Sequence, residues 1–251
     1  MEDTIQPTTM DDPGTSLAPL TAAPPTWPAS ARRLLKPRAP RPVPGVAKER
    51  PAPLGLAAGL APYTAPLDRR RAAHLLRRAG FGAPPEAVNA LLGVPGHEAA
   101  AALVAEAAAA PAPPAPSWAG AVPPRDTDSD AFDRFVDANV RWNDELIESL
   151  YRQMYDGGLR EKMALFWHGH FVTEHETYFF APLAYRYTAL LRRHALGDFR
   201  QFVFDVGLDP AMLIYLNGDL NTREEPNENY ARELLELFTM GQFDAAGQPN
   251  Y

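Results

Sequence analysis

The sequence contains no cysteine, and this absence excludes two kinds of chemistry. Without a thiol the chain forms no disulfide and no zinc site with thiolate ligands, so a bound metal would need imidazole or oxygen donors. The sequence also has no run of about eighteen apolar residues, the length that a membrane-spanning helix requires. We therefore expect no transmembrane segment.

Positive charge is in the minority. The chain has 24 lysines and arginines against 31 aspartates and glutamates, for a net charge of −7. No overall basic field attracts nucleic acid, so we expect no nucleic-acid partner. Hydrophobic residues make up 46% of the 251 positions, which is enough to build a substantial folded core.

Proline is abundant, with 27 residues concentrated in two tracts. Residues 1–62 combine Pro and Ala with few aromatic side chains, so burial cannot offset the entropy of ordering and we expect a disordered tail. Residues 111–128 form the second tract, expected to be a surface loop within a helical domain spanning 63–251. The tail contains Arg32 and Arg33, as twin-arginine export signals do, but prolines and further arginines follow instead of an apolar segment. A solvated basic tail is the simpler interpretation.

Apolar residues recur at helical spacing from about residue 64 onward, and no pair of strands is evident. The spacing, together with Pro and Gly at the expected ends, predicts helices over 66–79, 84–92, 96–110, 130–155, 159–176, 178–195 and 226–238, with shorter helical segments after Asp198 and Asp209. The fold class is therefore all-α, a multi-helix bundle with orthogonal and antiparallel packing. Nothing in 242–251 closes this fold, so we expect the chain to be the N-terminal part of a longer, truncated domain.

The richest polar stretch is the loop 217–228, which leads into the last predicted helix. On that helix Tyr230, Leu234, Leu237 and Phe238 share a face and are expected to be buried. The loop has the spacing of a calcium-binding loop, with donors expected at positions one, three, five and twelve, occupied by Asn217, Asp219, Asn221 and Glu228. Thr222 stands where such loops need glycine, and Pro226 stiffens the loop. The alternative is a polar turn followed by a helix N-terminus.

A second candidate lies in the segment containing His168, Gly169 and His170, which is followed by Glu174 and His175. Imidazoles bind zinc, copper or iron. Residues two apart on a regular helix project about 200° from each other, so His168 and His170 could share an ion only if Gly169 breaks the helix. On an unbroken helix His170 is instead placed to pair with Glu174. The alternative is a helix end whose histidines bond to neighbouring groups.

A third pattern would unite these two motifs. Glu228, Glu233 and Glu236 could face the histidine segment, because helical bundles build metal sites from histidine and carboxylate on different helices. The competing interpretation is a solvated ion-pair network in which Arg232 lies between Glu228 and Glu236. The spacing accounts for this second interpretation without any site.

Five ordered segments resemble one bacterial family. They lie at His74–Gly82, Lys162–Phe171, Leu190–Phe199, Asp209–Leu216 and Pro226–Thr239. In order and spacing they are similar to the domain-of-unknown-function family numbered 1800, over about residues 64 to 251. The resemblance implies no established activity. It implies a longer domain and an exported protein encoded beside a second exported protein, whereas the absence of a clear signal favours the cytoplasm.

Two functions remain open at this stage. In the first, a helical scaffold or binding module engages a partner protein of the bacterial envelope. In the second, a metal-dependent, hydrolase-like enzyme uses a His/carboxylate cleft: His168, His170, Asp219, Asn221 and Glu228 hold a divalent ion, Zn²⁺ or Ca²⁺, and Glu174 and Glu233 act as acid or base. No motif supplies a complete catalytic set, so the first function is favoured. The sequence leaves the substrate, metal and partner undefined.

Overall fold

The computed structural model describes residues 61–124 and 129–250. This part of the chain is helical and contains no β-strand, only two isolated bridges, so the predicted all-α fold is confirmed. The predicted tail 1–62 lies outside the described residues except for its last two positions. Within the described ranges no helix is both long and apolar enough to cross a membrane.

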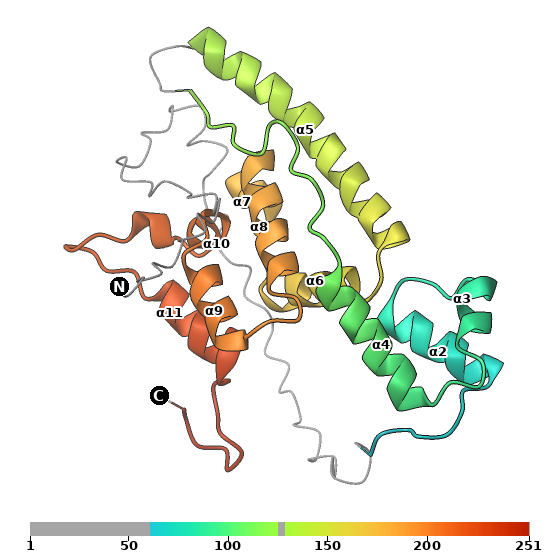
Figure 1. Cartoon of the computed structure of the whole chain (residues 1–251). Coiled ribbons are helices and arrows are strands. Elements are labelled where there is room, and N and C mark those ends of the chain that lie inside the picture. The colour runs from blue at the N-terminus through green and yellow to red at the C-terminus, as the bar shows by residue number, and fades with distance from the viewer. Residues whose placement is uncertain (1–60, 125–128, 251) are drawn as a thin grey trace, which may run out of the picture.

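Three helices that lie between residues 61 and 124 form a small unit of their own (Figure 1). They are α2 (Arg69–Ala79), α3 (Pro85–Ala90) and α4 (Gly96–Ala109), packed around Leu67, Ala72, Val88 and Ala99. Helix α2 begins later than the predicted residue 66 because Asp68 caps it, its carboxylate accepting the amide of Arg71 at 2.8 Å.

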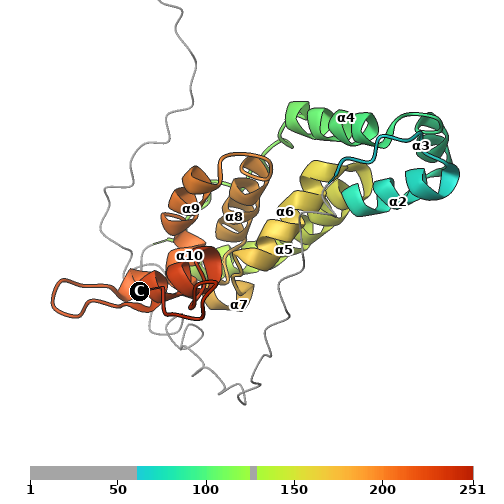
Figure 2. The ribbon, with the colours of Figure 1, turned by 90° about the horizontal axis from the view of Figure 1, so that it is seen from below.

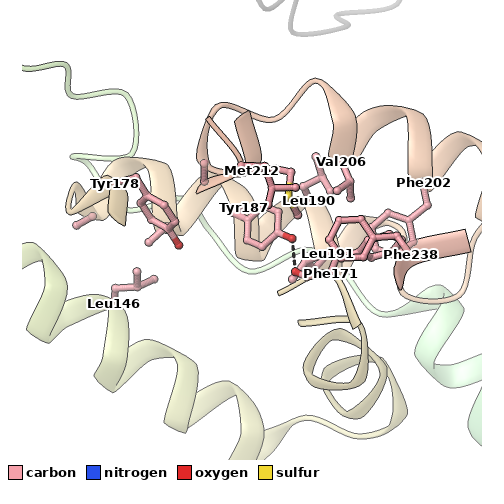
Figure 3. Packing of buried hydrophobic residues seen from close by; sticks show 14 of the residues in the cluster. Leu146, Phe171, Tyr178, Tyr187, Leu190, Leu191, Phe202, Val206, Met212 and Phe238 are labelled. Carbon is pink, nitrogen blue, oxygen red and sulfur yellow. Dashed lines mark hydrogen bonds between the residues drawn. The ribbon is translucent and has the colours of Figure 1, made fainter. Parts of the chain in front are cut away.

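The remaining helices build the main body. They are α5 (Ser129–Asp156), α6 (Leu159–His170), α7 (His175–Tyr178), α8 (Ala181–Arg193), α9 (Phe199–Gly207), α10 (Pro210–Tyr215), the 3-10 turn η2 (Gly218–Leu220), α11 (Asn229–Glu233) and the π-helical segment η3 (Leu234–Thr239). Helix α8 packs against both α5 and α6, as Figures 1 and 2 show from two sides. The centre of the core is filled by Phe171, Tyr187, Leu191, Phe202, Val206 and Met212 (Figure 3).

The predicted helix 178–195 begins later than expected, at Ala181, because a turn separates it from α7. Phe179 has a positive φ of 60°, which ends α7 and turns the chain before α8 begins at Ala181. The fully buried Asn139 of α5 supports this turn: its Nδ2 donates to the carbonyl of Phe179 at 3.1 Å, and its Oδ1 accepts the amide of Ala181 at 2.8 Å. The break therefore depends on a residue forty positions away, which helical spacing cannot reveal.

The proline-rich loop does not simply run over the surface as predicted. Trp118 is only 6% exposed and joins the main core, where its ring stacks on Trp142 with 5.9 Å between centroids. Its Nε1 donates to the carboxylate of Glu145 at 2.6 Å. One aromatic side chain thus fastens the second proline tract to α5.

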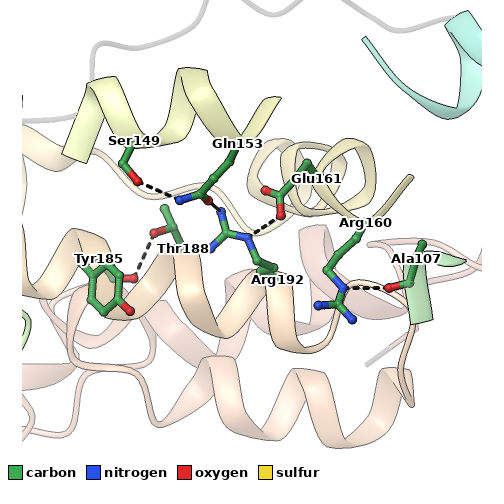
Figure 4. A network of polar contacts seen from close by, with 8 residues as sticks. All are labelled: Ala107, Ser149, Gln153, Arg160, Glu161, Tyr185, Thr188 and Arg192. Carbon is green, nitrogen blue, oxygen red and sulfur yellow. Dashed lines mark hydrogen bonds and ion pairs between the residues drawn. The ribbon is translucent and has the colours of Figure 1, made fainter. Parts of the chain in front are cut away.

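A buried ion pair joins three helices of the body (Figure 4). Arg192 of α8 is 8% exposed and donates through Nε to Glu161 of α6 at 2.7 Å. Its second guanidinium nitrogen donates to Gln153 of α5. Nearby, Arg160 donates to the carbonyls of Ala107 and Ala108 at 2.9 and 3.1 Å, which joins α6 to the end of α4.

Candidate functional site at the junction of α6 and η3

Helix α6 runs unbroken through the histidine segment. It ends at His170, so Gly169 does not open the turn that a shared metal site would need. His168 lies near the ring of Tyr187 in α8, with centroids 6.3 Å apart, whereas His170 points to η3. Burial lowers the pKa of His168 below its ordinary value, which favours a neutral imidazole. The two histidines therefore serve different neighbours.

His170 joins the end of α6 to the last helical segment. Its Nε2 lies 2.9 Å from the carbonyl oxygen of Phe238, and because a carbonyl only accepts, Nε2 must carry the proton. That nitrogen is therefore not available as a metal ligand in this arrangement. The imidazole is surrounded by the rings of Trp167, Phe171, Phe199 and Phe238, with centroids 4.8 to 6.5 Å away.

The segment after α6 carries the other candidates of this motif. Glu174 is exposed and stands at the N-terminus of α7, not beside His170 as an unbroken helix would place it. Burial lowers the pKa of His175, and its Nδ1 is buried without a hydrogen-bond partner among the described residues. Thr173 is buried and its hydroxyl lies 3.2 Å from the hydroxyl of Tyr178.

The loop 217–228 is closed by its own side chains. Asn221 uses Oδ1 to accept the amide of Asn227 at 3.0 Å, and Asn227 in turn donates to the carbonyl of Asn217 at 3.2 Å. Thr222 accepts the amide of Glu225 at 2.9 Å. Asn221, a predicted metal ligand, thus has its acceptor oxygen engaged in shaping a polar turn.

The remaining two calcium candidates also have local roles. The side chain of Glu228 is 84% exposed and accepts from Arg232 at 2.9 Å, one turn along α11. Asp219 lies in the 3-10 turn η2, where burial raises the pKa of its carboxyl and backbone amides partly oppose that rise. The contact between Glu228 and Arg232 is the one expected of the ion-pair interpretation.

The helix after this loop differs from its prediction. Pro226 precedes it instead of forming its first turn, because α11 begins only at Asn229. From Leu234 onward the helix widens to π geometry, a form often found at functional sites. Gly241, with φ of +81°, ends the segment as predicted. Leu237 was predicted to be buried and is 65% exposed, since the π-helical turns rotate it away from the core.

Both carboxylates predicted as acid or base lie within electrostatic reach of one tyrosine. Burial raises the pKa of Tyr215, and the charges of Glu174 and Glu233 raise it further. The charges of Glu174 and Glu233, from separate segments of the chain, thus act on one phenol that sequence patterns did not single out. Tyr215 follows the apolar residues of α10 and gave no separate signal.

Asp209 is a second polar residue whose importance the sequence did not show. It was predicted as a helix start, and it does accept the amide of Ala211 at 2.9 Å at the beginning of α10. It is also only 6% exposed, and burial raises its pKa to about 6. Its negative charge contributes to raising the pKa values of the buried Tyr178 and Tyr187.

No metal-binding group of three or more histidine or carboxylate side chains is present in residues 61–124 and 129–250. The seven residues named as candidates divide between the C-terminal end of α6 with the segment after it, the loop 217–228 and α11. His170, Asn221 and Glu228 already have partners within the chain. Their roles in metal binding or acid–base chemistry stay predictions.

The junction does expose apolar side chains from three elements. Phe166 is 57% exposed and precedes His170 by one turn of α6. Phe199 of α9 is 42% exposed and contacts Trp167 and His170, with ring centroids 5.6 and 6.5 Å away. Leu237 of η3 is the third. We call Phe166, Phe199 and Leu237 the junction surface.

Comparison with known proteins identifies a family for the chain. Residues 74–250 match the profile of the family described as protein of unknown function (DUF1800). No curated protein and no solved structure matches the chain.

Proposed function

The chain belongs to the DUF1800 family of proteins of unknown function, and we propose that it is a helical interaction module that binds a partner protein through its junction surface. The observation that carries this proposal is the contrast in chemistry at the junction. The imidazole of His170 is engaged by the carbonyl of Phe238, while the side chains of Phe166, Phe199 and Leu237 are exposed to solvent. Exposed apolar groups in a folded domain favour protein association.

The partner's chemistry follows from that contrast. A surface of two phenyl rings and a leucine, with the imidazole of His170 set among aromatic rings, fits an apolar segment such as one face of an amphipathic helix. We place this partner in the bacterial envelope, since the family resemblance implies export. Aromatic anchors of this kind contribute most of the binding free energy of an interface.

Site-specific photo-cross-linking in the cells that produce the protein tests this proposal. A cross-linking residue at position 166 should give one defined product, and the Phe199→Asp substitution should remove it. Val104 on α4 is the matched control site, because its exposure of 48% is close to the 57% of Phe166. Equal products from positions 104 and 166, or none from either, would refute the proposal.

One observation favours the metal-dependent enzyme as a second candidate. The Nδ1 of His175 is buried without a partner among the described residues, and Glu174 is its neighbour in the chain. An unpaired buried nitrogen of this kind could serve a ligand. Elemental analysis of the purified chain distinguishes the two candidate functions. A content of about one zinc or calcium per chain that is lost in His175→Ala would support the enzyme. A chain without stoichiometric metal leaves the interaction module as the function.

A further inference from the structure

Helix α5 has two apolar faces, of which the body covers one. Phe135, Trp142 and Leu146 pack inward. A second apolar stripe is formed by Val140, Ile147, Tyr151 and Tyr155, which are 55%, 53%, 70% and 90% exposed. With 3.6 residues per turn, these side chains project roughly 100° to 180° away from Leu146. The stripe therefore lies on the side of the helix away from the core.

Acidic side chains accompany this stripe and form a shallow groove with it. The groove is lined by Asp144, Ile147, Glu148, Tyr151, Arg152, Tyr155 and Asp156. Three carboxylates face one guanidinium there, and that guanidinium already pairs with Glu148 at 2.5 Å. The groove thus combines two exposed tyrosine rings with a net negative charge, which is the chemistry that suits a basic segment rich in proline.

The chain itself contains such a segment. Residues 31–50 have seven lysines and arginines against one glutamate, and prolines at positions 37, 40, 42 and 44. We propose that residues 31–50 dock along the groove of α5 in the same chain. Proline rings pack against tyrosine faces, arginine guanidinium groups stack on the same rings, and the remaining positive charges meet Asp144 and Asp156.

The tether between segment and groove is long enough for this contact. Arg160 bonds to the end of α4, and the amine of Lys162 lies 4.8 Å from the ring centre of Phe81, so the start of α6 rests on the unit of α2 to α4. The end of α5, with Tyr155, directly precedes α6 and lies beside this unit (Figures 1 and 2). Ten residues, 51–60, span at most about 35 Å when extended. A short tether also gives a high effective concentration.

Paramagnetic labelling of the full chain tests the docking, and the absence of cysteine makes the label unique. A nitroxide on Ala39→Cys should broaden the backbone amide signals of residues 144–156. The double substitution Tyr151→Ala and Tyr155→Ala should restore the signals of α5. The control Val104→Ala, on an exposed site of α4, should not restore them.

A mixed sample shows whether the segment in the groove of α5 comes from the same chain or from a second copy. Isotope-labelled chain without the nitroxide is combined with nitroxide-labelled chain at natural isotope abundance. Broadening of residues 144–156 in this mixture would show that a second copy supplies the segment, and would overturn docking within one chain. Signals of α5 that stay sharp in the singly labelled chain would overturn the proposal as well. The junction surface takes no part in these measurements, so they leave the proposed function untouched.

Discussion

Asp209 is the residue where burial and charge oppose each other most strongly. Its carboxylate is needed at the start of α10, where it accepts the amide of Ala211, yet almost no solvent reaches it. Burial raises the pKa of this carboxyl from 3.8 to about 6, while the backbone amides of Ala211 and Met212 act in the opposite direction. The folded chain therefore binds a proton on Asp209 more readily than the unfolded chain does.

Replacing Asp209 by Asn should flatten one part of the pH dependence of stability. Between about pH 4 and pH 6 the native state holds more protons at this site, so this contribution to the free energy of unfolding falls as pH rises and is lost above pH 6. Asp209→Asn keeps an acceptor for Ala211 without the charge. The variant should gain up to about 3 kcal/mol relative to wild type between pH 4 and 7, measured by urea unfolding. An equal difference at both pH values would contradict the assignment.

Asn139 shows how one polar residue can define a turn. Both polar atoms of its side chain are used, one by Phe179 and one by Ala181, and no water reaches them. Asn139→Ala would leave a buried carbonyl and a buried amide unpaired, which should lower the free energy of unfolding by about 2–4 kcal/mol in thermal or urea unfolding. Asn143→Ala, one turn along α5, is the control and should cost under about 1 kcal/mol. Similar losses in both variants would exclude the role given to Asn139.

Among the helical segments, the position of η3 depends most on a contact with another element, the end of α6. Its π geometry places the carbonyl of Phe238 where His170 can donate to it, and the ring of Phe238 is buried against Phe171 with centroids 5.3 Å apart. The hydrogen bond from His170 and the packing of Phe238 on Phe171 therefore fix the end of α6 against the end of η3.

His170→Ala should loosen η3 more than the rest of the fold. The loss of one hydrogen bond and of the ring contacts should cost about 1–3 kcal/mol and should speed hydrogen exchange of the amides of residues 234–241. His170→Gln keeps a donor and should recover part of this protection. His74→Ala on the exposed face of α2 is the control. Unchanged exchange in 234–241 would show that the contact does not hold the segment.

The ends of helices were predicted correctly where they depend on residues nearby in the sequence. The long helix was predicted over 130–155 and spans Ser129–Asp156, and Gly241 ends η3 as its position suggested. Predictions failed where a distant contact decides. The helix predicted from residue 178 begins only at Ala181 because Asn139 supports the turn at Phe179, and Leu237 is exposed because η3 widens. One signal was readable: Asn139 is a polar residue within the apolar stripe of α5 that contains Phe135 and Trp142.

At the scale of the whole molecule, the sequence predicted where polar residues gather but not which of them meet. The ends of α6 and of the last helix do come together, through His170 and the backbone of Phe238. The carboxylate expected there, Glu228, pairs instead with Arg232, because i and i+4 positions on one helix are already neighbours. Local pairing thus takes precedence over the long-range convergence that a metal site would need.

The buried pair of Arg192 and Glu161 fixes α8, α6 and α5 relative to one another. Arg192→Met should leave Glu161 buried without its partner and lower the free energy of unfolding by about 3–5 kcal/mol. The double variant Arg192→Met and Glu161→Met should recover most of this loss, since an apolar pair needs no ionic partner. The exposed pair of Arg152 and Glu148 is the control, and Arg152→Met should cost under about 1 kcal/mol.

A double-mutant cycle in urea unfolding measures the coupling between the two side chains. A coupling free energy near zero, or a double variant as unstable as the sum of the single ones, would mean that the pair does not act as a unit. The third contact makes the expectation sharper: Gln153 also accepts from Arg192, so Gln153→Ala should weaken the coupling between Arg192 and Glu161. The guanidinium group of Arg192 would then hold α5, α6 and α8 in their relative positions.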